Sequence, residues 1–278
     1  MAHAHLVHPD SKVNLKDVDT TPPKGVDEIL VKSETDELHD KLDKLQQLIY
    51  AAGTHSLLIV LQGRDTSGKD GTIRVLSTCL NVQHVNVASF KQPTAEDLGH
   101  DFLWRINKET PSKGHISIFN RSQYEDVLVV RVHDLVPPHV WKKRYEDIND
   151  FESEIAAGAN TIIVKFYLHI SKKEQESRLL AREDDPDKSW KLSVGDWKER
   201  EFWGAYTEAY EDALSKCSKK DAPWYIVPAD KKWYRDFCVA KVLVESLEPY
   251  KKDWEKALEK IGKKAKLELA AFRHSNTT

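Results

Sequence analysis

The chain has 278 residues, of which 40% are hydrophobic and 31% charged, and this composition excludes collagenous, low-complexity and largely disordered proteins. The 42 Lys and Arg residues nearly balance the 45 Asp and Glu residues, so no whole-molecule basic field favours nucleic acid or an anionic membrane as a partner. Three cysteines without a CxxC pair argue against a disulfide framework, and no run of apolar residues is long enough to span a bilayer. We therefore expect a cytoplasmic protein without a signal peptide or membrane anchor.

The N-terminal part of the chain divides into two segments. Residues 1–32 mix prolines, histidines and charges, and predict an arm that either wraps the domain or is disordered. From Ser33, leucines at helical spacing predict a packing helix that ends at Gly53, with Ser33 or Thr35 as its cap. We expect one domain over residues 33–250, followed by a Lys-rich helical tail over residues 251–278.

Five short β-rich runs alternate with helical stretches in the predicted domain. Because these runs are apolar on both faces, they indicate a mainly parallel five-stranded sheet between two layers of helices, an α/β fold of three layers. Ligands of such sheets bind at the carboxyl ends of the strands. A long, highly charged stretch over about residues 171–220 predicts a mobile lid instead of core. The five runs are residues 57–62, 85–90, 115–120, 161–168 and 224–229.

The first run leads directly into a glycine-rich loop, residues 63–71, that matches G-x-x-x-x-G-K and precedes a helical stretch. In this context the loop amides curl around a phosphate, the helix N-terminus adds positive potential, and Lys69 reaches the transferred phosphoryl group. A simple glycine turn is the alternative. The remaining candidate phosphate-binding residues of the loop are Gly63, Arg64, Thr66, Ser67, Gly68, Asp70 and Gly71.

Two residues of the loop depart from the usual motif. Asp70 follows Lys69, where a Ser or Thr normally binds Mg²⁺, and Asp65 places a carboxylate inside an anion-binding loop. A carboxylate among phosphates needs a cation, so Asp65 is a candidate to hold Mg²⁺ or to position the attacking group. The alternative for Asp65 is a loop or helix cap.

Polar residues also follow the third run. Asn120 and Arg121 stand at the carboxyl end of a strand expected beside the loop, and Arg121 suits a bidentate phosphate contact. Glu125 and Asp126 lie one turn further on, where either could hold the metal or form a solvated helix start.

The predicted lid supplies further cations. Arg178 and Arg182 share one helical face that could close over phosphates, with Lys191 nearby, although a surface stripe paired with neighbouring acids is the alternative. Arg74, Lys91 and Arg131 complete the candidate phosphate-binding residues. Zinc-ligand spacings and hydrolase motifs are missing from the sequence, so it gives no support to zinc chemistry or a hydrolytic triad.

Four segments in order resemble the family-2 polyphosphate kinases, over about residues 38–247. The FNRSxYEDVL form of the third segment resembles the class III subgroup. The four segments are GRDTSGKDG (63–71), PTAEDLGHDFLWR (93–105), FNRSQYEDVLVVRV (119–132) and DDPDKSWKLSVGDW (184–197).

The resemblance implies a thymidylate-kinase-like fold and reversible, Mg²⁺-dependent transfer of the terminal phosphoryl group of inorganic polyphosphate to nucleotides, with Mn²⁺ as a substitute metal. ADP and GDP are the implied acceptors, and the subgroup adds AMP and GMP. The family is often oligomeric, which implies a homodimer or homotetramer.

The resemblance also implies roles for single residues. Lys69 and the loop amides would cradle phosphate, Asp65 would bind metal and orient the acceptor, and Arg121 would bind nucleotide phosphate. Arg178 and Arg182 would close from the lid. Many members have Asp where this chain has Asn120, which draws attention to Glu125 or Asp126 as a metal ligand and to Glu125 as a determinant of AMP use.

Three alternatives remain open from the sequence. An ATP-dependent nucleoside monophosphate kinase would use the same fold and differ in its phosphate donor. A P-loop switch is disfavoured by Asp70 and by the Arg-rich lid, and a nucleic-acid-binding protein by the net charge of −3. The sequence leaves open the preferred base, the direction of transfer and the polyphosphate length.

Overall fold

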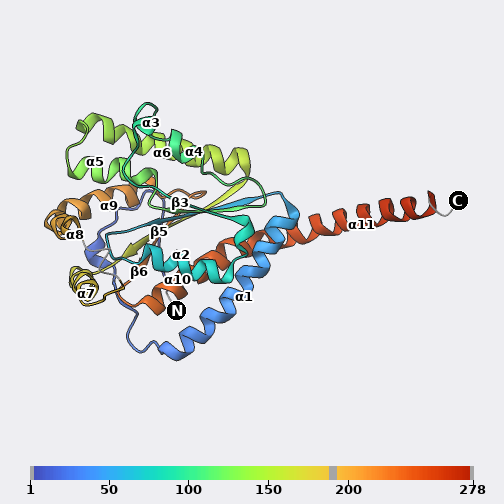
Figure 1. Cartoon of the computed structure of the whole chain (residues 1–278), viewed down its shortest axis with the longest axis horizontal. Coiled ribbons are helices and arrows are strands. Elements are labelled where there is room, and N and C mark those ends of the chain that lie inside the picture. Colours follow the sequence, from blue (N-terminus) through green and yellow to red (C-terminus); the bar gives the residue numbers. More distant parts are fainter. Residues whose placement is uncertain (1–2, 188–192, 276–278) are drawn as a thin grey trace.

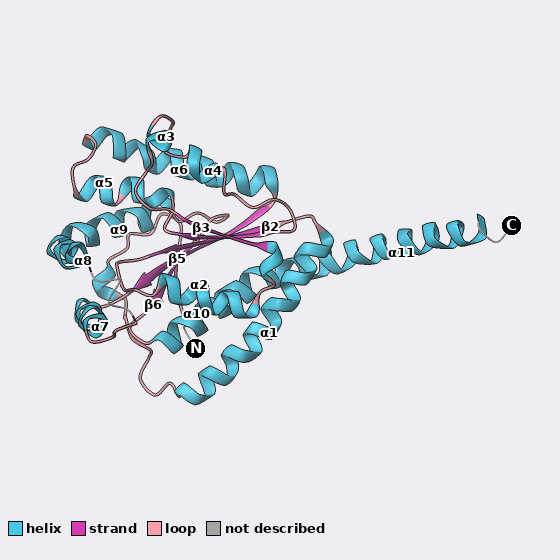
Figure 2. Cartoon of the chain, viewed as in Figure 1, coloured by secondary structure: helices cyan, strands magenta, loops and turns pink. Residues whose placement is uncertain are grey.

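A six-stranded sheet forms the middle of the molecule in the computed structural model, which describes residues 3–187 and 193–275. Its strand order is β1-β6-β5-β2-β4-β3, and every pairing is parallel except that of β1 with β6. Helices cover both faces (Figure 2), so the predicted three-layer α/β fold is confirmed. The strands are β1 (His5–Val7), β2 (Ser56–Gln62), β3 (Val85–Ser89), β4 (Ile116–Asn120), β5 (Thr161–His169) and β6 (Trp224–Pro228).

The fully buried strand β2 shows how the core divides around the sheet. Leu57 and Ile59 belong to one hydrophobic cluster, whereas Leu58 and Val60 belong to the cluster on the opposite face, as the two-residue period of a strand requires. Helices α1, α2 and α10 cover the first face, and α4, α6 and α9 lie over the second (Figure 1).

The longer helices are α1 (Glu28–Ala52), α2 (Lys69–Cys79), α6 (Pro138–Ala159), α7 (Lys172–Glu183), α9 (Trp203–Cys217), α10 (Lys232–Leu247) and α11 (Lys251–Ser275). The short ones are α3 (Ala95–Leu98), α4 (Trp104–Asn107), α5 (Val129–Val132) and α8 (Val194–Glu199), and a 3₁₀ turn, η3, spans Gln123–Val127. Helix α1 begins five residues before the predicted start. The carboxylate of Asp27, not Ser33 or Thr35, caps it by accepting hydrogen bonds from the amides of Ile29 and Leu30.

The sixth strand comes from the N-terminal arm, where no strand was predicted. Strand β1 pairs antiparallel with β6 at the edge of the sheet. Because it has only three residues, it is too short to show an alternating pattern in the sequence. Val7, Val13 and Leu15 are buried in the core cluster that also contains α9. The arm therefore wraps the domain.

The prediction of a lid over residues 171–220 is wrong for its C-terminal part. Helix α9 buries Tyr210, Leu214 and Cys217 against the sheet, so it is core. Helices α7 and α8 lie together at the end of the molecule opposite the projecting helix α11 (Figure 1).

Helix α11 leaves the domain as a single projecting rod (Figure 1). Trp254 in its first turns is fully buried, stacks on Tyr250 and donates a hydrogen bond to Nδ1 of His55 at 3.1 Å. In the part of the chain that the structure describes, no helix is both long and apolar enough to cross a membrane.

The imidazole of His169 gives the fold a dependence on pH. Its Nε2 donates to the carbonyl of Leu15 in the arm at 3.1 Å, and burial lowers its pKa. The unfolded chain therefore binds the proton more readily, so stability falls as pH drops below about 6.5.

The variant His169→Gln keeps a hydrogen-bond donor toward Leu15. We expect its melting temperature to fall less than that of the wild type when the pH is lowered from 7 to 5. Thermal unfolding at both pH values measures this difference. An equal or larger loss in the variant would show that His169 does not carry the effect.

Candidate active site

The glycine-rich loop connects the central strand β2 to helix α2. Gly63 and Gly68 have φ values of 153° and 108°, in the region that favours glycine, and no side chain caps the first turn of α2. Its first amides therefore face the loop interior, where the helix dipole favours an anion. The buried side-chain oxygens of Thr66, Ser67 and Thr72 have no hydrogen-bond partner among the described residues, which fits a site that an oxygen-rich ligand completes.

Lys69 lies at the centre of this loop. Its Nζ donates to the carbonyls of Gly63 at 2.6 Å and Arg64 at 3.2 Å, and the side chain is buried. Burial lowers the pKa of the ammonium group, and the carboxylate of Asp65 opposes that shift. The loop thus holds a buried cation with few protein partners, ready to exchange them for phosphate oxygens.

Strand β4 pairs with β2 and brings its carboxyl end to the loop, with Asn120 beside Leu61 in the register. Nη2 of Arg121 donates to Asp65 Oδ1 at 3.0 Å, and Nη1 lies 3.6 Å from Glu125 Oε2. Nδ2 of Asn120 donates to Asp70 Oδ1 at 3.0 Å. The structure therefore places the loop and the predicted β4 residues in one cluster around Lys69.

The guanidinium of Arg64 does not belong to this cluster. It stacks 3.8 Å from the ring centroid of Trp203 and donates to the Trp203 carbonyl and to Oγ1 of Thr207. The structure gives the Arg64 side chain packing contacts between the loop and α9, and phosphate binding by Arg64 stays a prediction.

Asp126 also points away from the loop. Its Oδ1 accepts from Nη1 of Arg144 at 3.2 Å, and Oδ2 lies 3.8 Å from Arg105. Burial raises the pKa of this carboxyl, and the two arginines oppose the shift. Successive side chains of a 3₁₀ turn project about 120° apart, so Glu125 faces Arg121 while Asp126 faces α4 and α6. The carboxylate of Asp126 thus contacts two arginines in this structure, and its role as a metal ligand stays a prediction.

Arg131 on α5 is similarly engaged elsewhere. It pairs with Asp212 of α9 at 2.6 Å and lies over the ring of Trp141 at 4.7 Å. These contacts join α5, α6 and α9, and phosphate binding by Arg131 stays a prediction.

Arg178 of α7 supports the loop from outside. Nη1 donates to the carbonyls of Thr66 at 2.9 Å and Ser67 at 3.3 Å, and Nη2 donates to Ala229 and Asp230 after β6. Its Nε donates to Glu174. Each guanidinium nitrogen is engaged with the protein, so in this structure Arg178 holds the loop backbone, and its closure over a phosphate stays a prediction.

The remaining predicted cations are spread around the site. Arg182 pairs with Asp196 of α8 at 3.0 Å. Arg74 is exposed on α2, and Lys91 is exposed after β3, at the same edge of the sheet as the loop. Lys191 lies outside the described residues.

Two residues that sequence reasoning missed also shape the loop. Gln175 donates to the Asp65 carbonyl at 3.1 Å; its position three residues before Arg178 on one helix was the signal that could have found it. Arg235 of α10 is buried, and a Cβ on Gly68 would lie 2.0 Å from its Nη1. Gly68 is thus favoured by its φ, and a side chain there would also displace the end of the Arg235 side chain, a contact that no local sequence pattern shows.

The donor set suits a hard divalent cation. Asp65 and Glu125 supply carboxylate oxygens near Lys69, and Mg²⁺ takes one or two carboxylates together with phosphate oxygens and water. Across residues 3–187 and 193–275 there is no cluster of three His, Cys, Asp or Glu side chains placed to hold a metal. The residues fit a metal that the bound phosphates help to coordinate.

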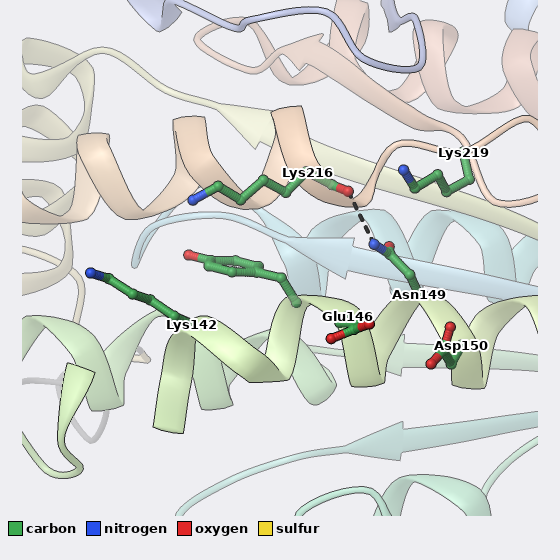
Figure 3. A pocket seen from close by; sticks show the side chains of 7 residues that line it. Lys142, Glu146, Asn149, Asp150, Lys216 and Lys219 are labelled. Carbon is green, nitrogen blue, oxygen red and sulfur yellow. Dashed lines mark hydrogen bonds between the residues drawn. The ribbon is translucent and has the colours of Figure 1, made fainter. Parts of the chain in front are cut away.

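A groove of about 560 Å³ lies away from the loop, between α6 and α9 (Figure 3). Three lysines line it together with two acids, and the amide of Asn149 donates to the Lys216 carbonyl at 3.1 Å. Because its charges are mixed and it contains no loop residue, this groove does not belong to the phosphate site.

Known proteins are similar in sequence to this chain over most of its length. The family model described as Polyphosphate kinase 2 matches residues 26–255. The chain belongs to the polyphosphate kinase 2 family. The resemblance predicted from the four segments is thereby confirmed, as is the class of enzyme, a polyphosphate kinase.

Individual members of the polyphosphate kinase 2 family align closely. The AMP/ADP-polyphosphate phosphotransferase of Meiothermus ruber is 48% identical over 247 residues, 88% of this chain and 92% of that protein. The ADP-polyphosphate phosphotransferase of Rhodopseudomonas palustris is 46% identical over 76% of this chain and 77% of its own. The crystal structure of polyphosphate kinase 2 from Arthrobacter aurescens TC1 superposes with a TM-score of 0.83 at 39% identity, covering 90% of this chain and 92% of that one.

Proposed function

We propose that this kinase transfers the terminal phosphoryl group of inorganic polyphosphate to ADP and AMP, and to GDP and GMP, reversibly and with Mg²⁺ or Mn²⁺. The observation that carries the proposal is the meeting of Lys69, Asp65, Arg121 and Glu125 at the phosphate loop. The Meiothermus ruber relative, whose name includes both AMP and ADP, supports the breadth of acceptors.

In the proposed reaction an oxygen of the acceptor's terminal phosphate attacks the end phosphorus of polyphosphate in line. The new P–O bond forms as the bond to the next phosphate breaks, and a polyphosphate shorter by one unit leaves with that electron pair. No covalent enzyme intermediate is required.

The residues of the site act by positioning and by charge. Lys69 and the amides at the start of α2 stabilise the negative charge on the transferred group, and Arg121 holds the acceptor phosphate. Asp65 orients Arg121 through their 3.0 Å contact. Asp65 and Glu125 would hold the metal, which when bound neutralises charge between the two phosphate substrates.

An ATP-dependent nucleoside monophosphate kinase is the second candidate, because the same loop serves both reactions. The donor separates the two. We expect ADP to be formed from AMP with polyphosphate as the only donor, and the proposal fails if ATP supports this reaction and polyphosphate does not.

Glu125 is proposed to favour the shorter acceptor. At the end of β4 this chain has the amide of Asn120, which donates to Asp70, and no carboxylate. In the turn that follows β4, Glu125 supplies a carboxylate that pairs with Arg121. We expect Glu125→Gln to lower the AMP rate about tenfold relative to the ADP rate, equivalent to about 1.4 kcal/mol of transition-state stabilisation.

Initial rates with both acceptors measure that ratio. Glu37→Gln, a substitution of an exposed carboxylate on α1, is the matched control and should leave the ratio unchanged. If Glu125→Gln preserves the original ratio, Glu125 does not select the acceptor.

We also propose that the enzyme is a cytoplasmic homo-oligomer, a dimer or tetramer, with no nucleic-acid or membrane partner. The three cysteines are free, and α11 exposes Ile261, Leu269 and Phe272 on one helical face. Light scattering tests the assembly: we expect a multimer whose mass falls to that of one chain when Ile261, Leu269 and Phe272 are changed to Ser. A wild-type protein of single-chain mass would refute the proposal.

A further inference from the structure

A buried polar cluster lies beneath the turn η3, outside the phosphate site. Lys165 from the middle of β5 is fully buried and forms an ion pair with Glu152 of α6, whose exposure is 1%. Lys165 Nζ also donates to Tyr124 OH at 2.8 Å and to the carbonyl of Cys217 at 2.7 Å. The mechanism above uses none of these groups.

Both charged residues contact the turn that follows β4. Glu152 Oε1 accepts hydrogen bonds from Nε2 of Gln123 at 2.8 Å and from Tyr124 OH at 2.9 Å. Tyr124 OH thus donates to Glu152 and accepts from Lys165. Two consecutive residues of η3 are therefore fastened to one carboxylate, which the buried ammonium group holds in place.

This attachment lies next to the reacting region. Arg121 has a φ of 63°, a left-handed conformation that is unfavourable for a residue with a side chain and persists only where the surroundings enforce it. On one side its amide donates to the Leu61 carbonyl at 3.0 Å. On the other side the chain passes through Ser122 into Gln123 and Tyr124, and Glu125 follows Tyr124.

A requirement for stability alone does not explain a buried ion pair. Two charges removed from water lose hydration, and well-packed apolar residues of similar volume often serve equally well. The hydrogen bonds to Gln123 and Tyr124 are directional, however, and apolar side chains cannot provide them. What the pair supplies beyond packing is a fixed position for η3.

We propose that Glu152 and Lys165 are positioning residues for phosphoryl transfer: through Gln123 and Tyr124 they hold Arg121 and Glu125 against the phosphate loop. The inference rests on the proposed function for its kinetic readout. The binding of ADP, which requires no transfer, provides a second readout.

The first test is Tyr124→Phe, which removes the hydroxyl that joins the pair to the turn while keeping the ring packed edge-on against Trp224. We expect kcat with polyphosphate and ADP to fall about 10 to 100-fold. Tyr145→Phe, which removes a buried hydroxyl on α6 outside the cluster, is the matched control and should retain wild-type kcat.

The second test compares two double variants that both remove the buried charges. Glu152→Gln with Lys165→Met keeps an amide oxygen able to accept from Tyr124, whereas Glu152→Leu with Lys165→Met keeps none. We expect melting temperatures within about 5 °C of each other, because neither variant buries an unpaired charge. The glutamine variant should retain at least about tenfold more kcat than the leucine variant.

Calorimetric titration with ADP tests the positioning role of Glu152 and Lys165 separately from the proposed phosphotransfer function. We expect Kd for ADP to rise about tenfold in Tyr124→Phe, whether or not polyphosphate is the donor. If the wild type binds ADP but transfers nothing from polyphosphate, the proposed function fails and the titration still tests positioning. Wild-type kcat and Kd in Tyr124→Phe, or equal kcat in the two double variants, would overturn the inference.

Discussion

We expect Lys69→Ala to lower kcat for polyphosphate-dependent ADP phosphorylation about 100 to 1,000-fold. Lys69 is the buried ammonium group of the phosphate loop, held by the carbonyls of Gly63 and Arg64. Its charge acts where the transferred group becomes most negative, in a site that excludes much of the water, so no surface lysine substitutes for it. The coupled measurement of ATP formation at saturating substrates gives kcat.

The control for this prediction is Lys41→Ala, which removes an exposed lysine of α1 and should leave kcat unchanged. Circular dichroism establishes that both variants are folded. A folded Lys69→Ala enzyme with a rate near that of the wild type would remove Lys69 from the mechanism.

Asp65→Asn is expected to lower kcat at least about 100-fold and to raise the Mg²⁺ concentration needed for half-maximal rate. The substitution keeps the size of the side chain but removes the charge that Arg121 binds at 3.0 Å and that a metal would require. Rates measured over a range of Mg²⁺ concentrations separate the two effects, because a lost metal ligand is partly compensated by more metal and a lost Arg121 contact is not.

The matched carboxylate for that experiment is Asp36, which is exposed on α1. Asp36→Asn should reproduce the wild-type Mg²⁺ dependence. Wild-type kcat and Mg²⁺ dependence in Asp65→Asn would contradict the role assigned to this residue.

The sheet and the phosphate loop were predictable because their signals are local. A strand buried on both faces, such as β2, needs a continuous apolar run, and a loop that wraps phosphate needs glycines and a lysine at fixed spacing. The position of Arg121 beside Asp65 follows from the same logic, since parallel neighbours end at one edge of the sheet.

The partners of the other cations were not predictable. Helical spacing fixes the phase of Arg178, but whether it faces a phosphate or the loop backbone depends on how α7 packs on the loop and on the residues after β6. Arg64 and Arg131 likewise find aromatic and acidic partners on helices far away in sequence. The sequence shows where arginines stand and which helical face they share, whereas tertiary packing decides which groups they contact.

Two errors in the fold have a similar origin. Helix α9 carries a charged outer face and a narrow buried face built from residues such as Ala209 and Leu214, so the mean composition suggests a lid while the burial is that of core. Strand β1 has three residues, and its pairing with β6 depends on an edge that only the folded sheet provides.

The most direct test of the account is the formation of ATP from long-chain polyphosphate and ADP, and of ADP from AMP, with Mg²⁺ and no other phosphate donor. The account predicts product from both acceptors, with polyphosphate shortened by one phosphate for each nucleotide phosphorylated. No product from either acceptor, alongside ATP-dependent phosphorylation of a nucleoside monophosphate by the same preparation, would contradict it.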